Sequence, residues 1–373
     1  MSFKLIIGIP SYNEKDTISN VVKDIDNALC LLPYPITAYI VNSDNNSTDL
    51  TREAFLNTST QNKKISLVTT QKGKGWNFKN IFDYFSENNF DAIIFMDSDL
   101  VYVSEEWITK LTKKLLDGYD AVYTRRLPRW NNGDLTYHVA LPVLKSFFGA
   151  NIHEPISGDF GFSKRLVNMA QSYHWDTNIM GYGIDFFLSS LTTELKWCEI
   201  ILNCKKDHKL RSYSRNSNGF ITMNPKFKEV LFTVKHMISL KYSFPEFNIK
   251  TNVADNFYGE NTFNLEPAPQ FDSDIEELKL SVQKMYLLNE IAFKKQFINC
   301  ESYFNRKKFI GIPSTYWFQC LKQFIQTEDS LVNSKSIDLM ENIFFCRVIG
   351  FHNEIQGIKD WYDIVEKYTF SFP

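Results

Sequence analysis

The chain has 373 residues, which is enough for about two domains of ordinary size. Hydrophobic residues make up 44% and charged residues 23% of the sequence, so a globally disordered protein is excluded and a sizeable core is possible. The 41 lysines and arginines nearly balance the 43 aspartates and glutamates, and the formal net charge is −2. The chain therefore lacks the surplus of basic residues that is typical of dedicated nucleic-acid-binding proteins, and this balance argues against that class.

The N-terminal part of the chain alternates between strand-like and helix-like segments. Short apolar and β-branched runs predict strands at 4–10, 36–41, 65–68, 92–96 and 121–124. Apolar residues at helical spacing predict helices between them, at 15–31, 48–56, 76–85 and 104–116. This order predicts an α/β protein with a mostly parallel, Rossmann-like sheet that is flanked by helices.

The segments after residue 124 include further helices and one strand, and from about Phe220 long helical patterns dominate. A helix is predicted from Lys164, another over 186–195, and a strand over 196–203. Further helices are predicted at 227–240, 275–297, 316–325, 337–349 and 358–368, with an irregular segment at 242–269. We therefore divide the chain into an α/β domain over 1–219 and a mainly helical subdomain over 220–373. Whether the helical part packs on the first domain or mediates a homodimer stays open at this stage.

The cysteines and the hydropathy pattern bear on the compartment. The six cysteines contain no CxxC pair, and their spacing indicates neither a zinc site nor a disulfide framework. The sequence has no run of about 18 uncharged apolar residues, and its N-terminal apolar run is too short for a signal peptide. We expect free thiols, no transmembrane segment and a cytoplasmic protein.

Polar clusters follow four of the predicted strands, at 11–14, 43–47, 71–75 and 97–99. In a parallel sheet ligands bind outside the carboxyl ends of the strands, so these clusters are expected to lie along one edge. Asp97 and Asp99 are the sharpest signal, because an i, i+2 spacing in extended backbone places both carboxylates on the same side. Such oxygen donors suit Mg²⁺ or Mn²⁺, although a polar turn that closes the strand would have the same sequence.

The clusters also carry a resemblance to a known family. IPSYNE at 9–14, DNNSTD at 44–49, KGKG at 72–75 and DSD at 97–99 follow one another in the order of the nucleotide-sugar-binding half of GT-A fold glycosyltransferases. The resemblance covers about residues 4–215. It implies that residues 1–219 form a GT-A catalytic domain that binds a nucleoside-diphosphate sugar, such as a UDP- or GDP-hexose, with Mn²⁺ or Mg²⁺.

The resemblance assigns the nucleotide-binding residues. Pro10, Tyr12 and Glu14 match the loop that contacts the base and the ribose, and Asp44 matches the acidic residue at the base edge. Asn46 stands where the family has glycine, and asparagine tolerates the left-handed turn that glycine would supply.

The same resemblance assigns residues near the diphosphate and the metal. Lys74 lies in the element near the donor sugar and phosphates, with a solvated loop lysine as the alternative. Asp97, Ser98 and Asp99 match the DxD motif, in which the two aspartates bind the metal and Asp99 is the more direct ligand. His208 matches the histidine that completes the metal site in retaining glucosyl-3-phosphoglycerate and mannosylglycerate synthases, although a lone histidine is also commonly structural.

On the acceptor side the resemblance points to two further acids. The loop at 155–162 is similar to the acceptor loop of those synthases, with Asp159 in place of a glutamate; a simple β-turn is the alternative. Asp185 is expected to orient the acceptor, or to act as the general base in an inverting enzyme, or only to stabilise a helix N-terminus. The cluster at 125–129 contains three arginines that could hold an acidic acceptor, or form a solvated basic loop.

Together these features predict a metal-dependent glycosyltransferase that moves a hexose to an acceptor hydroxyl. The loop at 155–162 and His208 favour retention and a small acidic acceptor such as a glycerate, with a glycan acceptor also open. The alternatives are an inverting, family-two-type transferase with Asp185 as base, and a non-catalytic nucleotide-sugar-binding protein.

Overall fold

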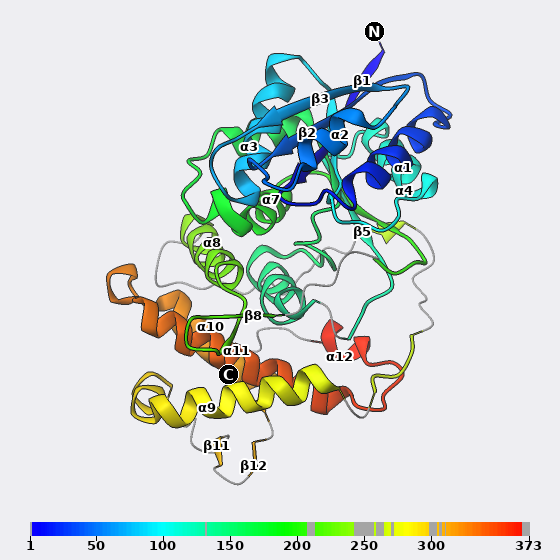
Figure 1. Cartoon of the computed structure of the whole chain (residues 1–373). Helices are drawn as coiled ribbons and strands as arrows, with labels where there is room; N and C mark the ends of the chain where they lie inside the picture. Colours follow the sequence, from blue (N-terminus) through cyan, green and yellow to red (C-terminus); the bar gives the residue numbers. More distant parts are fainter. Residues whose placement is uncertain are drawn as a thin grey trace.

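Eight strands form one mixed sheet in the order β10-β7-β5-β6-β4-β1-β2-β3 in the computed structural model of the chain (Figure 1). The strands are β1 (Phe3–Ser11), β2 (Ile36–Asp44), β3 (Lys63–Val68), β4 (Ala92–Phe95), β5 (Ala121–Arg125), β6 (Phe160–Ser163), β7 (Trp197–Ile201) and β10 (Phe257–Tyr258). The structure describes residues 2–130, 133–206, 213–241, 257–258, 265–269, 272–297, 304–305, 308–309 and 311–367. The predicted α/β class and the five predicted N-terminal strands are confirmed.

Helices cover both faces of the sheet. Alternating strand residues explain this, because Leu5 and Ile7 pack with α1 and α4 on one face, while Ile6 packs with α3 on the other. The helices of this part are α1 (Ile18–Cys30), α2 (Thr51–Asn57), α3 (Lys74–Glu87), α4 (Glu105–Leu116), α6 (Lys164–Gln171) and α7 (Ile184–Thr192). The order of the elements thus agrees with the βαβ alternation in the sequence.

One strand runs against the others. β6 lies antiparallel between β4 and β5, with Gly161 opposite Ile94 and Val122. The sequence pattern did not predict it, because a four-residue strand with Phe160 and Phe162 both in the core is too short for a clear alternation. Its first three residues are the last three of the predicted acceptor loop at 155–162, so the loop is shorter than predicted and ends at Asp159.

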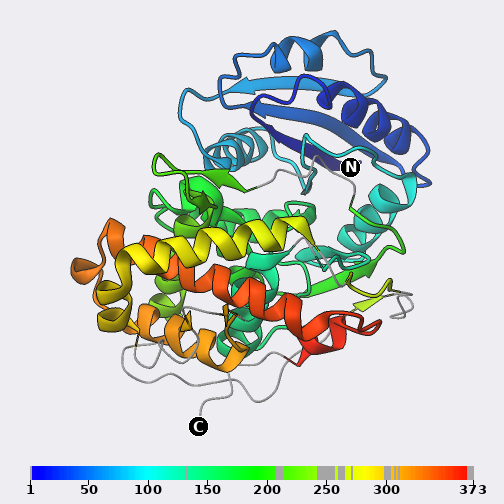
Figure 2. The ribbon, with the colours of Figure 1, turned by 60° about the horizontal axis from the view of Figure 1, so that its bottom comes forward.

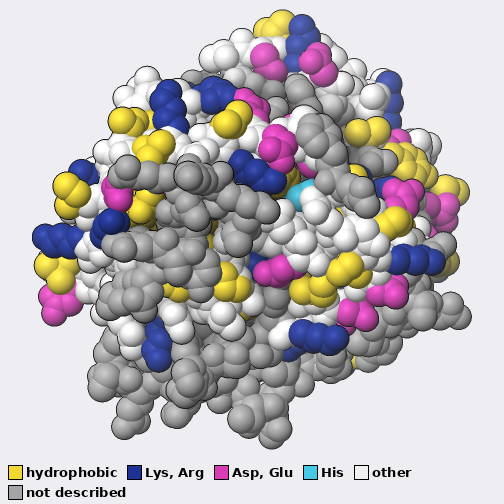
Figure 3. Space-filling view, turned by 90° about the horizontal axis from the view of Figure 1, so that it is seen from below, with side chains coloured by type: hydrophobic (Ala, Val, Ile, Leu, Met, Phe, Trp, Pro, Cys, Tyr) yellow, Lys and Arg dark blue, Asp and Glu magenta, His cyan; other side chains and the backbone are white. Residues whose placement is uncertain are grey.

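The C-terminal helices pack below the sheet. They are α8 (Lys226–Lys241), α9 (Ser273–Gln296), α10 (Ser314–Gln326), α11 (Ser334–Ile355) and α12 (Tyr362–Glu366). α9 and α11 lie side by side in both views (Figures 1 and 2). Seen from below, the described side chains of both charges are interspersed with apolar ones (Figure 3). Among the described residues, no helix combines the length and the apolar character that crossing a membrane requires.

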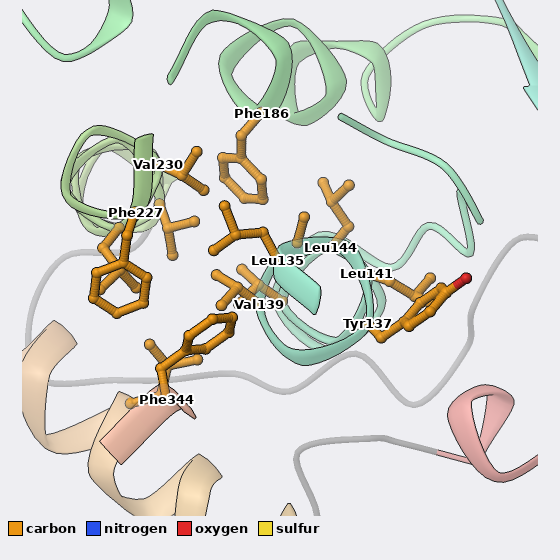
Figure 4. Packing of buried hydrophobic residues seen from close by; sticks show 14 of the residues in the cluster. Leu135, Tyr137, Val139, Leu141, Leu144, Phe186, Phe227, Val230 and Phe344 are labelled. Carbon is orange, nitrogen blue, oxygen red and sulfur yellow. The ribbon is translucent and has the colours of Figure 1, made fainter. Parts of the chain in front are cut away.

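A continuous apolar core joins these helices to the sheet. Leu135 and Val139, on the helical segment that extends to Phe148, face Phe227 and Val230 of α8 and Phe344 of α11 (Figure 4). The segment consists of the π-helical turns η1 (Thr136–Ala140) and η2 (Leu144–Phe148) around the short α5 (Leu141–Val143). It is buried between the two parts of the chain, so the C-terminal helices pack on the sheet-bearing part. The division of the chain at residue 220 stays a prediction.

Candidate active site

The ends of β1, β2, β3 and β4 meet at one edge of the sheet. Ser11 at the end of β1 pairs in parallel with Asp44 at the end of β2, and Asp44 pairs with Val68 at the end of β3. β4 lies parallel to β1 on its other side, so the turn at 97–99 leaves the sheet at the same edge. The expectation that the polar clusters gather at one edge is confirmed, and they form the candidate active site.

Asp44 is buried at this edge and held by hydrogen bonds. Its carboxylate accepts one from the Ser11 hydroxyl at 3.1 Å, and two from the amide and hydroxyl of Ser47 at 2.7 and 2.6 Å. Asn46 has a φ of 57°, so asparagine supplies the left-handed turn as expected from the sequence. The predicted contact of Asp44 with a base stays a prediction.

The loop after β1 meets the loop after β3 through Tyr12. The Lys72 ammonium donates to the Tyr12 hydroxyl at 3.0 Å and lies 5.2 Å from the centre of its ring. Tyr12 is 36% exposed, whereas Pro10 and Glu14 are buried. The Glu14 amide donates to the Thr51 hydroxyl at 2.8 Å, which fixes the loop. Tyr12 therefore presents part of its ring to solvent, whereas Pro10 and Glu14 belong to the buried part of the loop.

Lys74 begins α3 and joins two of the predicted acids. Its ammonium lies 2.8 Å from Asp185 Oδ2 and 3.5 Å from Asp97 Oδ1. Burial lowers the pKa of Lys74, but the charges of Asp185 and Asp97 outweigh burial and raise this pKa above its usual value. Lys74 is thus a fixed cation among carboxylates, and not a solvated loop lysine.

Lys206, just after β7, is a second cation at the same aspartate. Its ammonium lies 2.6 Å from Asp97 Oδ2 and 2.5 Å from Asp159 Oδ2, and it donates to the Ser157 carbonyl at 2.6 Å. Burial lowers the pKa of Lys206, but the charges of Asp159 and Asp97 raise it by more than that. The net shift of this pKa is therefore upward. Asp97 therefore lies between two ammonium groups, one on each carboxylate oxygen.

Asp159 lies beneath the site and not at its surface. Its side chain is fully buried and accepts from the Arg126 guanidinium at 3.0 Å. The other oxygen of Asp159 accepts from the Asp97 amide at 3.3 Å. Arg126 also pairs with Glu154 at 3.0 Å. These contacts hold Lys206 and the 97–99 turn in place, which is a positioning role.

Asp185 lies in the first turn of α7, and one of its two carboxylate oxygens accepts no hydrogen bond from the described residues. Burial raises the pKa of this carboxyl, while the charge of Lys74 lowers it, and the net shift is upward. Oδ2 accepts from Lys74, whereas Oδ1 is buried and accepts no hydrogen bond from the described part of the chain. An unsatisfied buried oxygen is costly, so Oδ1 is suited to accept a hydrogen bond from a bound hydroxyl.

Two glycines allow the loops to approach this closely. Gly158 has a φ of +82°, and a Cβ there would lie 2.5 Å from Asp97 Oδ1 and 2.6 Å from Lys74 Nζ. Gly75, in the first turn of α3, lies against the backbone of Ile179, where a Cβ would be 2.0 Å from the carbonyl oxygen. A side chain at either position would separate the charged groups.

Asp97 and Asp99 supply the carboxylates of the predicted metal site. Both are partly exposed, and hard oxygen donors suit Mn²⁺ or Mg²⁺. Ser98 between them is buried, and its carbonyl accepts from the Thr17 hydroxyl at 2.8 Å. Within the described ranges, no three His, Cys, Asp or Glu side chains form a group that could hold a metal ion. His208, the predicted third ligand, lies outside those ranges, so the aspartates fit part of a ligand set.

Sequence reasoning missed Lys206 and Lys226 as site residues and assigned Arg126 a different role. Lys206 could have been predicted from the sequence, because it is a cation in the segment that follows a strand. Only His208 from that segment was assigned to the site. The sequence left two alternatives for Arg126, binding an acidic acceptor or lying in a solvated basic loop, whereas the residue is buried against Asp159 and Glu154. Only packing reveals that difference.

Comparison with known proteins shows which family the first part of the chain is similar to. Residues 6–169 match the family model described as glycosyl transferase family 2. A dolichol-phosphate mannosyltransferase from Pyrococcus furiosus is 28% identical over 178 residues, which are 44% of this chain and 47% of that protein. An uncharacterised glycosyltransferase from Synechocystis is 31% identical over 131 residues, which are 35% of this chain and 39% of that protein. The chain thus spans less than half the length of these relatives.

Among solved structures, glucosyl-3-phosphoglycerate synthase from Mycobacterium tuberculosis, in complex with Mn²⁺, UDP and glucosyl-3-phosphoglycerate, is similar to this chain. The TM-score is 0.49 at 21% identity, and the match covers 65% of this chain and 82% of the synthase. The family model includes the strand ends that carry Asp44, Lys74 and Asp97. Residues 6–169 are therefore similar to glycosyl transferase family 2, and this match covers less than half of the chain.

Proposed function

We propose that this protein transfers a sugar from a nucleoside-diphosphate sugar to an acceptor hydroxyl. The observation that carries the proposal is the arrangement of Lys74, Asp97 and Asp185 at the strand ends of a family 2 domain. Lys74 comes from the start of α3, Asp97 from the turn after β4 and Asp185 from the first turn of α7, and ion pairs hold them together. Such a preorganised charge cluster is what a reaction with an anionic leaving group requires.

The cations of the site act on the leaving group. Negative charge builds on the diphosphate as its bond to the sugar breaks, and Lys74 and Lys206 lie on both sides of Asp97, where they offset that charge. When bound at Asp97 and Asp99, a Mn²⁺ or Mg²⁺ ion would supply further positive charge to the diphosphate. His208 is proposed as a third ligand of that ion from its place in the sequence.

Asp185 acts on the acceptor. In the proposed retaining reaction its free Oδ1 accepts a hydrogen bond from the acceptor hydroxyl and orients it. Retention, and a small acidic acceptor such as a glycerate, are supported by the resemblance of the loop at 155–162 to retaining synthases. The same free oxygen favours a second candidate, an inverting reaction in which Asp185 removes the acceptor proton, since burial raises the pKa of this carboxyl.

Donor hydrolysis tests the proposal, because many bound nucleotide sugars react slowly with water. UDP- and GDP-hexoses are incubated with the protein, with and without Mn²⁺, and the released nucleotide is measured. Asp99→Ala should abolish metal-dependent release and leave the melting temperature unchanged, because Asp99 is partly exposed and lies outside the core. Binding of nucleotide sugars without turnover by the wild type would favour the non-catalytic alternative.

Proton NMR of the first-formed glycoside tests the stereochemistry. With an α-linked donor, an α product supports retention and a β product makes Asp185 the general base. Asp185→Asn retains the size but loses basicity, so it should slow an inverting enzyme on the order of 10²–10⁴-fold. In the retaining reaction the same variant should mainly raise the acceptor KM.

A further inference from the structure

Arg125 and Arg126, two of the three arginines at 125–129, are not available to an acidic acceptor. Arg125 is 3% exposed and pairs with Glu366 of α12 at 2.6 Å. Arg126 is 1% exposed and pairs with Glu154 and Asp159. Both guanidinium groups are thus neutralised by carboxylates of the protein, and an anionic acceptor would need a different cation.

Lys226, the first residue of α8, lies next to the cluster and comes from the C-terminal helices. Its ammonium is 5.9 Å from the centre of the Tyr182 ring. Tyr182 is three residues before Asp185, and its amide donates at 2.8 Å to Glu229, one turn after Lys226. The start of α8 is thereby tied to the segment that carries Asp185.

The direction of the pKa shift of Lys226 agrees with this position. Burial lowers the pKa of Lys226, and the charge of Lys74 lowers it further, while Asp185 and Asp97 act in the opposite direction. Lys226 therefore interacts electrostatically with Lys74, Asp185 and Asp97, so it borders the same site.

Lys226 differs from the other two lysines because it makes no ion pair with the described residues. Lys74 and Lys206 each contact two carboxylates, whereas the side-chain contact of Lys226 with the described residues is the one with the Tyr182 ring. Both Lys226 and Tyr182 are exposed to solvent. An ammonium that is repelled by a nearby lysine, on a side chain that reaches solvent, would gain from a bound anion between the two lysines.

We propose that Lys226 binds an anionic group of the acceptor, a phosphate or a carboxylate, beside the hydroxyl that Asp185 orients. This inference rests on the proposed function, since it names the acceptor class of the same site. The donor diphosphate is a second anionic group that could bind the Lys226 ammonium. The position of Lys226 near Asp185, the proposed acceptor-side acid, favours the acceptor.

Calorimetric titration separates the two sources. 3-Phosphoglycerate, glycerol 3-phosphate and glycerol are the acceptor probes, and UDP is the donor probe. Lys226→Ala should weaken binding of both phosphorylated probes about tenfold or more, as expected for the loss of one charge-assisted contact, and leave UDP affinity within about twofold. Lys228→Ala, an exposed lysine on the same helix, is the matched control and should change neither.

The outcomes are distinct. A loss of UDP affinity with unchanged binding of the phosphorylated probes would assign Lys226 to the donor and overturn the proposal. Equal binding of these probes by wild type and Lys226→Ala, or no binding by either, would also overturn it. The titrations need no turnover, so they decide whether Lys226 binds an anion even if the protein does not hydrolyse a donor. A failure of donor hydrolysis would count against the proposed function only.

Discussion

Asp97 is the residue on which the site converges. One carboxylate oxygen contacts Lys74 and the other contacts Lys206, and the backbone amide donates to Asp159. The residue is thereby fixed from three directions before any ligand binds. Preorganisation of this kind avoids the cost of arranging charges during the reaction.

Gly158 provides a test of this arrangement at the scale of one methyl group. Gly158→Ala adds a Cβ that would lie within 2.6 Å of Asp97 Oδ1 and Lys74 Nζ, at a positive φ. The charged groups must move apart, and a displacement of this size is expected to reduce kcat on the order of 10²-fold. Steady-state kinetics checks this.

The control is Gly118→Ala, at a φ of +81° with open space around the added Cβ. It carries the same backbone strain without a clash. Equal kinetics of Gly158→Ala and wild type would show that the contact between Lys74 and Asp97 is not needed for turnover.

At the scale of elements, α12 is attached to the sheet by a buried charge network. Glu366 accepts from Arg125 at 2.6 Å and lies 3.4 Å from His153 Nε2, whose Nδ1 is 2.6 Å from Glu199. Burial lowers the pKa of His153, but Glu199 and Glu366 outweigh it and raise this pKa to about 9. The imidazolium is therefore part of the folded structure.

This network predicts a pH dependence of stability. The folded pKa of His153 lies above its unfolded value of about 6.5, so its stabilising effect is complete below pH ~6.5 and is lost as the pH rises towards 9. The melting temperature should fall across this window. In Glu366→Gln the fall in melting temperature should be smaller, because one of the two carboxylates that raise the pKa of His153 is removed.

Differential scanning fluorimetry between pH 6 and 9.5 measures the effect. Glu106→Gln, which removes a surface pair with Lys110, serves as the control and should follow the wild type. A melting temperature that is constant across the window in the wild type would contradict a charged His153.

The sequence predicted elements better than contacts. Strand ends could be located because apolar runs stop at polar residues, and Asn46 could be assigned its turn because few residues adopt a positive φ. The antiparallel β6 could not be predicted, since four residues carry too little periodicity. Pairings such as Lys206 with Asp159 join residues far apart in the chain, and no local pattern encodes them.

At the scale of the whole molecule, one core extends from the sheet into the C-terminal helices. Leu135 and Val139 contact Phe227 and Phe344, and the Trp317 indole of α10 donates to the His138 carbonyl at 2.6 Å. The helical segment around residue 140 is therefore covered only when the C-terminal helices are present. The two predicted parts of the chain are expected to depend on each other for stability.

A truncation tests that dependence. The fragment 1–219 would expose the apolar faces that α8 and α11 cover, and we expect it to be insoluble or to lack a cooperative thermal transition. The measurement is the soluble yield, followed by a circular dichroism melt, with the full chain as the reference. A soluble fragment that melts cooperatively would show that 1–219 folds independently.

The antiparallel β6 divides the sheet into two parallel groups, β1–β4 with the donor-side loops and β5, β7 and β10 on the other side. The loop before β6 brings Asp159 to the border between the groups, while Lys206 comes from the second group and Asp97 from the first. A change of acceptor during evolution would thus need new residues only in the second group and in the helices that adjoin it. Donor recognition would be inherited unchanged, so related chains could diversify in what they glycosylate while they keep the same activated sugar.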